Sequence, residues 1–182
     1  TGTKYGDPWS VRHDEETVEV KFNGQTVKAV PYDMPIFGCK TNHISTLRLW
    51  QSEAVNEFDF NLFNQQKYTE ASLEKNSAED ISRVLYPNDD TREGKKLRLK
   101  QQYFFCSASL QDITKKHFDR FGSLENISDS ITIQLNDTHP VISIPEFIRI
   151  LVNSGMDFER AFAITKKVFN YTNHTCLLYT SP

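Results

Sequence analysis

The sequence has few cysteines, no excess of positive charge and no long apolar run, and each shortage narrows the possible classes of protein. The three cysteines, Cys39, Cys106 and Cys176, lie far apart without Cys-x-x-Cys or Cys/His spacing, so they indicate neither a zinc or other metal site nor a disulfide framework. They fit a reducing, cytoplasmic compartment. No stretch approaches the roughly 20 apolar residues of a membrane span, and we expect no membrane contact.

The beginning of the chain lacks both an initiator Met and an apolar signal region. It reads TGTKYGDPWS. We therefore expect the chain to begin after processing or inside a longer protein.

The charge balance argues against a nucleic-acid partner. The formal charge is −3 and the pI is near 5.9, whereas binding to phosphates needs clustered cations that displace counterions. The basic run at residues 95–100 also contains Leu97 and Leu99 and is typical of a solvated helix face. With 182 residues, 38% of them hydrophobic and 25% charged, the chain is globular and long enough to bury a core.

Polar chemistry is concentrated within residues 131–153. An alternating apolar pattern at Ile131, Ile133 and Leu135 predicts a strand with one buried face. An amide, a carboxylate, a hydroxyl and an imidazole follow at residues 136–139, and Pro140 stops a regular continuation. Ser143 and Glu146 have the spacing of a capping box, so a helix should begin there.

The polar turn at residues 136–139 has two possible roles. In an open α/β sheet a strand-to-helix turn lies at the carboxyl edge, where ligands bind. Polar residues after a strand also serve as ordinary turn and cap chemistry. The local pattern leaves both roles open for Asp137 and His139.

The first third of the chain predicts β-structure. Apolar runs flank Asn23-Gly24 within residues 17–30, and both turn residues tolerate the positive φ of a tight hairpin turn. We expect Pro31 and Pro35 to close this hairpin and residues 44–50, ISTLRLW, to form another strand.

The remaining segments alternate between helices and polar loops. Residues 61–86 have a helical pattern, but the part from Gln65 to Ser77 is sparsely apolar, so it is either simply exposed or a dimer contact. Residues 86–94 predict a mobile, solvent-facing loop containing Asp89 and Asp90. A long helix is expected over residues 95–121, ending at Gly122. Asp157 should cap a last helix running through Phe169, which ends in a second polar cluster, YTNHT, at residues 171–175.

Several long motifs resemble the glycogen/starch/maltodextrin phosphorylases in both order and spacing. They are PYDMPIFG (31–38), TLRLW (46–50), RVLYPNDD (83–90), GKKLRLKQQYFF (94–105), LQDI (110–113), QLNDTHP (134–140), IPE (144–146) and YTNHT (171–175). The resemblance covers residues 5–175 and looks closer to the bacterial branch. It implies part of the N-terminal Rossmann-like domain of a two-domain GT-B glycosyltransferase fold, an α/β class.

The resemblance also implies a function. Members of the family carry out reversible phosphorolysis of α-1,4-glucan ends to glucose 1-phosphate, with pyridoxal phosphate as the cofactor. The family's cofactor lysine lies beyond residue 182, so this chain alone should be inactive. The implied partners are an α-glucan, inorganic phosphate and a second copy of the chain.

Matched by motif, the chain carries several of the family's site positions. Asp89 and Asp90 fall on the loop that gates the catalytic cleft. Asp137 and His139 fall beside the sugar pocket, and His174 matches the histidine that hydrogen-bonds glucose. The family commonly has Asn at position 90, and because Asp accepts but does not donate, that glucose contact is in question.

Three cations match the effector site of the animal enzymes. Lys115 and Lys116 fall where those enzymes have an arginine pair that binds effector phosphates, and Arg48 matches another residue of that site. Lysine keeps the charge but loses the bidentate fork, which weakens the prediction of nucleotide control. The helix at residues 65–77 falls where the family has its dimer-forming tower helix.

The resemblance divides residues 1–175, a partial N-terminal domain, into four regions. They are a hairpin region (17–50), a tower-type helix region (61–86), a gate loop (87–94) and a helix/strand/helix core (95–175). The match ends after Thr175, and we expect residues 176–182, CLLYTSP, to be a non-native tail.

Two other functions compete with this one. One is a non-catalytic carbohydrate-binding or regulatory relative that ends here and binds glucan by itself. The other is a metal hydrolase using His139, His174, Asp89 and Asp137, which no close ligand spacing supports.

Overall fold

A computed structural model describes residues 10–56 and 60–174 of the chain. The tail predicted from Cys176 onward, and the parts of other predictions that fall on residues 1–9, 57–59 and 175, lie outside this range. The chain divides into two compact units, one up to Phe104 and one from Phe105. The boundary falls within α4 (Arg92–Phe121).

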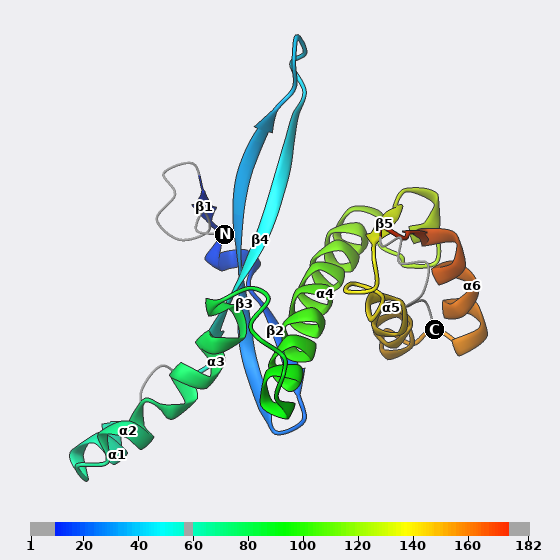
Figure 1. The fold of residues 1–182 in the computed structure, drawn as a ribbon. Helices are drawn as coiled ribbons and strands as arrows, with labels where there is room; N and C mark the ends of the chain where they lie inside the picture. Colours follow the sequence, from blue (N-terminus) through cyan, green and yellow to red (C-terminus); the bar gives the residue numbers. More distant parts are fainter. Residues whose placement is uncertain (1–9, 57–59, 175–182) are drawn as a thin grey trace. The chain divides into compact units, whose positions relative to one another are not determined.

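The first unit is built on an antiparallel four-stranded sheet (Figure 1). Strand β3 is central, with β4 along one edge and β1 and β2 along the other. Its elements are β1 (Val11–Arg12), the 3-10 turn η1 (Asp14–Glu16), β2 (Val18–Phe22), β3 (Gln25–Phe37), β4 (Ile44–Ala54), α1 (Phe60–Asn64), α2 (Tyr68–Ala71) and α3 (Leu73–Arg83).

The predicted hairpin is confirmed at its turn. Phe22 pairs with Gln25, which leaves Asn23-Gly24 as the two-residue loop, and Gly24 has the positive φ of 86° that this loop requires. The strand predicted at residues 44–50 is also confirmed, and it continues to Ala54.

The prolines do not close the hairpin, and this prediction was wrong. Pro31 and Pro35 lie inside β3, opposite Trp50 and Thr46 of β4. The carbonyl of Pro31 accepts the backbone N–H of His13, so this residue's backbone groups face away from β4. Backbone groups two residues apart face the same edge of an antiparallel strand. Neither proline therefore removes a donor from the β3–β4 ladder.

The predicted helix over residues 61–86 is interrupted. Three short helices, α1, α2 and α3, replace it, and Gln66, at a positive φ of 64°, separates the first two. Among the described side chains of these three helices, the buried ones belong to α3 and are Ala78, Ile81 and Ser82. The Ser82 hydroxyl accepts the backbone N–H of Ser52 on β4 at 2.9 Å. The described side chains of residues 65–77 are exposed apart from half-buried Ser72, as the pattern predicted.

The second unit contains a pair of parallel strands joined through two helices. Strand β5 (Ile133–Asn136) leads through α5 (Ser143–Asn153) and α6 (Phe158–Val168) to β6 (Phe169–Thr172). The last part of α4 and the 3-10 turn η2 (Ile127–Asp129) complete the unit. The core of this unit consists of Leu110, Ile127, Phe147, Leu151, Ala161, Ile164 and Val168.

Most of the predicted ends in this unit are confirmed. Helix α4 ends at Phe121, and Gly122 follows with a φ of 71°. Asp157 caps α6 by accepting the backbone N–H of Arg160 at 3.1 Å. Helix α6 ends at Val168 instead of including Phe169, which begins the unpredicted strand β6.

The prediction of a capping box at Ser143 and Glu146 was wrong, although α5 begins at Ser143 as expected. Ser143 lies inside the first turn, and the residue before the helix, Ile142, has no capping side-chain hydrogen bond. Glu146 instead accepts a hydrogen bond from the Ser107 hydroxyl at 2.6 Å and forms an ion pair with Arg149. Among the described residues, no helix has both the length and the apolar character needed to cross a membrane.

Candidate functional site

The two polar clusters meet at the carboxyl ends of β5 and β6. These strands are parallel and in register, with Asn136 opposite Thr172. The turn at residues 136–139 and the segment at residues 172–174 therefore leave the same edge of the sheet. Sequence reasoning found each cluster but not their pairing, because it extended the last helix through Phe169. Alternating aromatic and polar residues in FNYT (169–172) were the available signal.

Asp137 joins the two segments. Its backbone N–H donates to the carbonyl of Thr172 at 2.9 Å, and its Oδ1 accepts the backbone N–H of His174 at 2.8 Å. The residue has a φ of 62°, in the left-handed region that Asp tolerates better than most residues. A further contact on β5 and β6 runs from Gln134 Nε2 to the Thr172 hydroxyl at 2.7 Å.

The histidines predicted at the site lie on the surface. His139 and His174 are both exposed, whereas Asp137 is half-buried. The predicted site residues of this unit therefore present one carboxylate, two imidazoles and nearby amide and hydroxyl groups to solvent at one sheet edge.

A buried thiol lies beneath the turn that carries His139. Cys106 on α4 donates to the carbonyl of Pro140, with 3.8 Å between Sγ and O. Burial raises the pKa of this thiol above the ordinary value, although a hydrogen bond with Ser143 acts in the opposite direction. The thiol is therefore held in its neutral form, as a packing and hydrogen-bonding group.

Glu146 supports the beginning of α5 from the interior. It is only 3% exposed, accepts the Ser107 hydroxyl, and receives Arg149 Nε and Nη2 at 2.6 and 2.7 Å. Ser107 in turn accepts Gln111 Nε2 at 3.1 Å. A buried carboxylate needs such partners to offset desolvation. This network fastens α5, and with it the preceding turn, to α4.

The gate-loop residues lie in the first unit. The loop between α3 and α4 is fastened to the start of α4 by a contact from Asp89 Oδ2 to Arg98 Nη1 at 2.7 Å. Gln101 Nε2 donates to the carbonyl of Val84 at 2.6 Å. Asp90 exchanges hydrogen bonds with the side chain of Asn88, at 2.8 and 2.9 Å. Residues 92–94 of the predicted loop belong instead to the first turn of α4. The rest of the loop is mostly exposed, as predicted, and the Asp89–Arg98 and Gln101–Val84 contacts hold it to α4.

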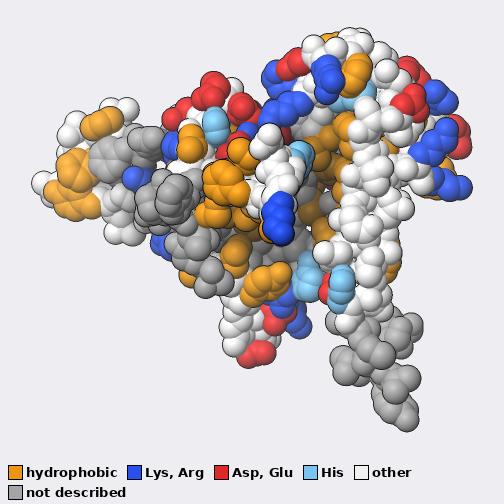
Figure 2. Space-filling model, turned by 90° about the horizontal axis from the view of Figure 1, so that it is seen from above, with side chains coloured by type: hydrophobic (Ala, Val, Ile, Leu, Met, Phe, Trp, Pro, Cys, Tyr) orange, Lys and Arg blue, Asp and Glu red, His pale blue; other side chains and the backbone are white. Residues whose placement is uncertain are grey.

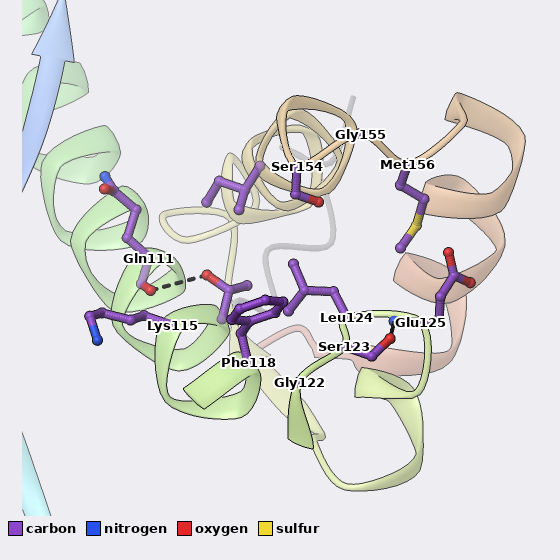
Figure 3. Close-up of a pocket in the computed structure, with 12 residues that line it drawn as sticks. Gln111, Lys115, Phe118, Gly122, Ser123, Leu124, Glu125, Ser154, Gly155 and Met156 are labelled. Carbon is purple, nitrogen blue, oxygen red and sulfur yellow. Dashed lines mark hydrogen bonds between the residues drawn. The ribbon is translucent and has the colours of Figure 1, made fainter. Parts of the chain in front are cut away.

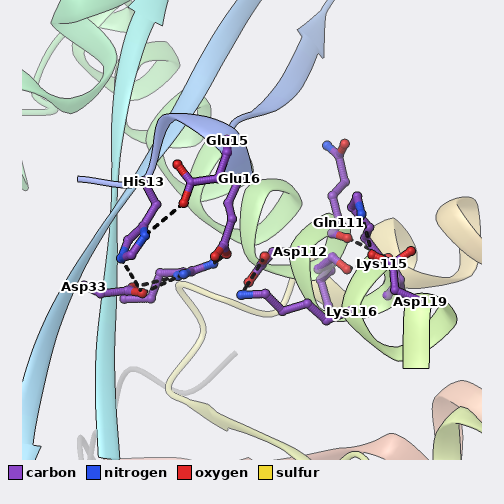
Figure 4. A network of polar contacts seen from close by, with 12 residues as sticks. His13, Glu15, Glu16, Asp33, Gln111, Asp112, Lys115, Lys116 and Asp119 are labelled. Atoms are coloured by element: carbon purple, nitrogen blue, oxygen red, sulfur yellow. Dashed lines mark hydrogen bonds and ion pairs between the residues drawn. The ribbon is translucent and has the colours of Figure 1, made fainter. Parts of the chain in front are cut away.

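Arg48, the first of the predicted effector positions, lies within a group of acids in the first unit. Figure 4 labels three of these acids, Glu15, Glu16 and Asp33. It donates to both carboxylate oxygens of Asp33 at 2.7 and 2.6 Å and to Glu16 at 2.5 Å. His13 lies within 3.3 Å of both Asp33 and Glu15. The charge of Arg48 is therefore largely neutralised by its own unit.

Lys115 and Lys116, the other predicted effector positions, project from α4 in the second unit. Lys115 forms an ion pair with Asp119, and Lys116 Nζ lies 3.1 Å from Asp112 (Figure 4). Lys115 also lines an open pocket of about 670 Å³ between the last turns of α4 and the end of α5 (Figure 3). This pocket borders the carboxyl end of α5, whereas the polar turn precedes its amino end, and it contains none of the predicted sugar residues.

Exposed apolar side chains mark other parts of the first unit. Figure 2 shows hydrophobic side chains on the surface of the segment that contains α1 and α2. Phe60, Phe63 and Tyr68 are 72, 43 and 55% exposed there. The ends of the β3–β4 hairpin also expose apolar residues, including Ile36, Phe37 and Ile44.

The strand ends are chemically suited to a hydroxyl-rich ligand. Carboxylate oxygens accept hydrogen bonds, amides and neutral imidazoles both donate and accept, and a sugar hydroxyl needs both. These groups lie at the carboxyl edge of parallel strands, and open α/β sheets bind their ligands at that edge.

The comparisons with known proteins agree on one family. The model of a family described as carbohydrate phosphorylase matches residues 3–180. The brain form of glycogen phosphorylase from Mus musculus is 46% identical over 197 aligned residues, which cover 96% of this chain and 23% of that protein. The muscle form from Ovis aries is 44% identical with the same coverage. Glycogen phosphorylase from Synechocystis is 43% identical, covering 94% of this chain and 23% of that protein. The chain thus spans about a quarter of the length of these relatives.

Proposed function

The chain belongs to the carbohydrate phosphorylase family, and on that premise we propose that its protein is an α-glucan phosphorylase. The proposed reaction moves a terminal α-1,4-linked glucosyl residue from the glucan to inorganic phosphate, giving glucose 1-phosphate. One observation in this chain carries the proposal: the motifs QLNDTHP and YTNHT end on adjacent parallel strands and present their polar residues at one edge.

The proposed fold is the N-terminal Rossmann-like part of a GT-B enzyme, with the division into regions predicted from the sequence. The parallel pair β5 and β6, connected through α5 and α6, supports this assignment. Parallel strands occur almost only in sheets covered by helices on their faces. The antiparallel sheet and the exposed helices of the first unit would be further parts of that domain.

The proposed sugar site contains His174 and His139, and Asp137 lies on the turn beside it. In this assignment His174 donates to or accepts from a glucose hydroxyl, and His139 lies beside it on the adjoining turn. Asp89 and Asp90 belong to the gate loop. The hydrogen bonds between Asp90 and Asn88 support a role for Asp90 in shaping that loop, because its carboxylate accepts from the Asn88 side chain.

The proposed cofactor is pyridoxal phosphate, held by a lysine outside this chain. A lysine that forms a Schiff base is commonly desolvated so that its amine is neutral. Every lysine within residues 10–56 and 60–174 is at least partly exposed, which does not fit that role. When bound, the cofactor would supply the acid-base chemistry of its phosphate, while the residues of this chain would bind and orient the sugar.

Two further proposals concern association and control. The exposed segment at residues 65–77, with Tyr68 and Leu73 at 55 and 62% exposure, would contact a second copy of the chain. Nucleotide control should be weak, because Arg48, Lys115 and Lys116 already pair with carboxylates that a phosphate would have to displace.

The activity assay uses protein expressed from the complete gene. It is incubated with an α-1,4-glucan and inorganic phosphate, and glucose 1-phosphate is measured for the wild type, for His174→Ala and for His43→Ala. His43 is a matched control, because it is also an exposed histidine. We expect product from the wild type and from His43→Ala, with at least a tenfold loss in His174→Ala, about the value of one hydrogen bond to a substrate. Glucan binding without any product would favour the non-catalytic relative.

A further inference from the structure

We propose that Asp137 is a positioning residue, which sets the location of His174 by binding its backbone and does not contact the sugar itself. The proposal concerns the proposed sugar site. Only the expected effect of Asp137 on catalysis rests on the proposed function. The hydrogen bond between Asp137 and His174 is present in the structure whatever the protein's function is.

The contacts of Asp137 continue the strand pairing beyond its last register position. Asn136 and Thr172 are the final partners of β5 and β6. One residue later, the N–H of Asp137 still reaches the carbonyl of Thr172 at 2.9 Å. Its side chain then takes the place of a backbone acceptor, because Oδ1 receives the N–H of His174 at 2.8 Å.

The backbone conformation of Asp137 explains how one residue makes both contacts. At a φ of 62° the chain turns sharply away from β5, so it cannot continue the ladder with its own carbonyl groups. The short carboxylate reaches across to the segment that follows β6 instead. Asp and Asn are the residues that combine tolerance of this φ with an acceptor at that length.

The arrangement fixes His174 where the pairing of the strands no longer does. The register of β5 with β6 ends at Thr172, and both residues that follow it, Asn173 and His174, are exposed. The bond to Asp137 therefore restrains the backbone of His174. A catalytic contact depends on such restraint, because small displacements of a binding group greatly reduce the rate.

The role of positioning requires an acceptor atom but no negative charge. Asp137→Asn keeps an Oδ1 acceptor and tolerates the same φ. Asp137→Gly tolerates the φ equally well and removes the acceptor, so it separates the loss of the hydrogen bond from backbone strain. The two variants form a matched pair at one position.

The test measures hydrogen exchange and kinetics on protein expressed from the complete gene. Exchange of the His174 amide is followed by mass spectrometry of a peptide that contains β6 and His174. In parallel, kcat and KM are measured with an α-1,4-glucan and phosphate. We expect Asp137→Asn to match the wild type in exchange and to keep kcat/KM within about twofold. In Asp137→Gly, exchange should rise roughly fivefold, the value of one hydrogen bond, and kcat/KM should fall about tenfold.

Two results would overturn the proposal. The first is unchanged His174 exchange in Asp137→Gly, which would mean that the hydrogen bond does not restrain this segment. The second is a loss of kcat/KM in Asp137→Asn as large as in Asp137→Gly while the His174 amide stays protected, which would assign the negative charge a direct role. If the wild type makes no glucose 1-phosphate, the proposed function fails, and the exchange data still decide whether Asp137 positions His174.

Discussion

The strand-end loops and the gate loop carry similar polar residues but are held in different ways. The strand-end loops, at residues 136–139 and 172–174, are joined by backbone pairing and by the Asp137 carboxylate. The gate loop between α3 and α4 is held by side chains of α4, mainly Arg98 and Gln101. The strand-end loops also follow strands packed on a buried core, whereas the Asp89–Arg98 ion pair is 46 and 26% exposed.

The difference indicates how each loop should respond to a change. Backbone pairing over a packed core is disturbed most when the core itself is altered. An exposed ion pair contributes little to stability and is weakened by salt. We therefore expect the strand-end loops to be preorganised and the gate loop to be adjustable. The following substitutions test that distinction, from the largest expected effect to the smallest.

Phe147→Ala should have the largest effect on the second unit. Phe147 is fully buried on α5 and meets the ring of Phe169, the first residue of β6, edge-on at 5.5 Å. Removing the ring should lower the free energy of unfolding by about 3–5 kcal/mol. Chemical denaturation measures this change. Phe162→Ala is the control, because Phe162 is 44% exposed and its removal should change stability by less than about 1 kcal/mol. Equal effects would show that the core does not support β6.

Gly94→Ala should displace the gate loop through its backbone. A Cβ at this position would lie 2.2 Å from the carbonyl oxygen of Asn88, far closer than two such atoms approach. The loop would have to move, at about 1–3 kcal/mol. Gly155→Ala is a control that adds no contact within 4 Å and tests only the strain of a positive φ. Denaturation and the activity assay should separate the two variants, and an unchanged Gly94→Ala protein would contradict the close packing of the loop.

The Cys106 thiol beneath the strand-end turn should make the stability of the protein depend on pH. Burial raises the pKa of Cys106 in the folded state, so the unfolded thiol loses its proton first as the pH rises. Its contribution to stability is therefore present below the ordinary pKa of 9.0 and is lost above it, by up to about 1.4 kcal/mol per pH unit. Unfolding between pH 7.5 and 10 should show a steeper decline for the wild type than for Cys106→Ala. Parallel curves would contradict this.

The smallest effect is expected from the ion pair of the gate loop. A double-mutant cycle with Asp89→Asn and Arg98→Gln should give a coupling energy of about 0.5 kcal/mol, because both groups are partly exposed. The coupling should fall in high salt. A coupling above about 2 kcal/mol that salt does not change would mean that the gate loop is held as firmly as the strand ends.

Local patterns in the sequence predicted the features that depend on neighbouring residues. Asn23-Gly24 gave the hairpin, Gly122 the end of α4, and Asp157 the cap of α6. Each of these depends on the φ or the hydrogen bonds of residues within one turn. The motifs at residues 134–140 and 171–175 likewise identified the candidate site.

Features that depend on distant partners could not be predicted from local pattern. Pro31 is tolerated in β3 because its backbone groups face away from β4. Its carbonyl accepts the backbone N–H of His13, eighteen positions earlier in the chain. Glu146 has the spacing of a capping box, but the hydroxyl of Ser107 on another helix binds its carboxylate instead. The pairing of β6 with β5, and so the meeting of the two polar clusters, also depends on tertiary structure.

The most direct test of the sugar site is hydrogen exchange with and without a short α-1,4-glucan, again on protein from the complete gene. The account predicts slower exchange in the peptides that cover residues 133–142 and 169–174 when the glucan is present, with no change in the β3–β4 hairpin at residues 34–47. Slower exchange in the gate loop would add that loop to the bound state. Protection of the hairpin alone, or none at the ends of β5 and β6, would contradict the assignment of the sugar site.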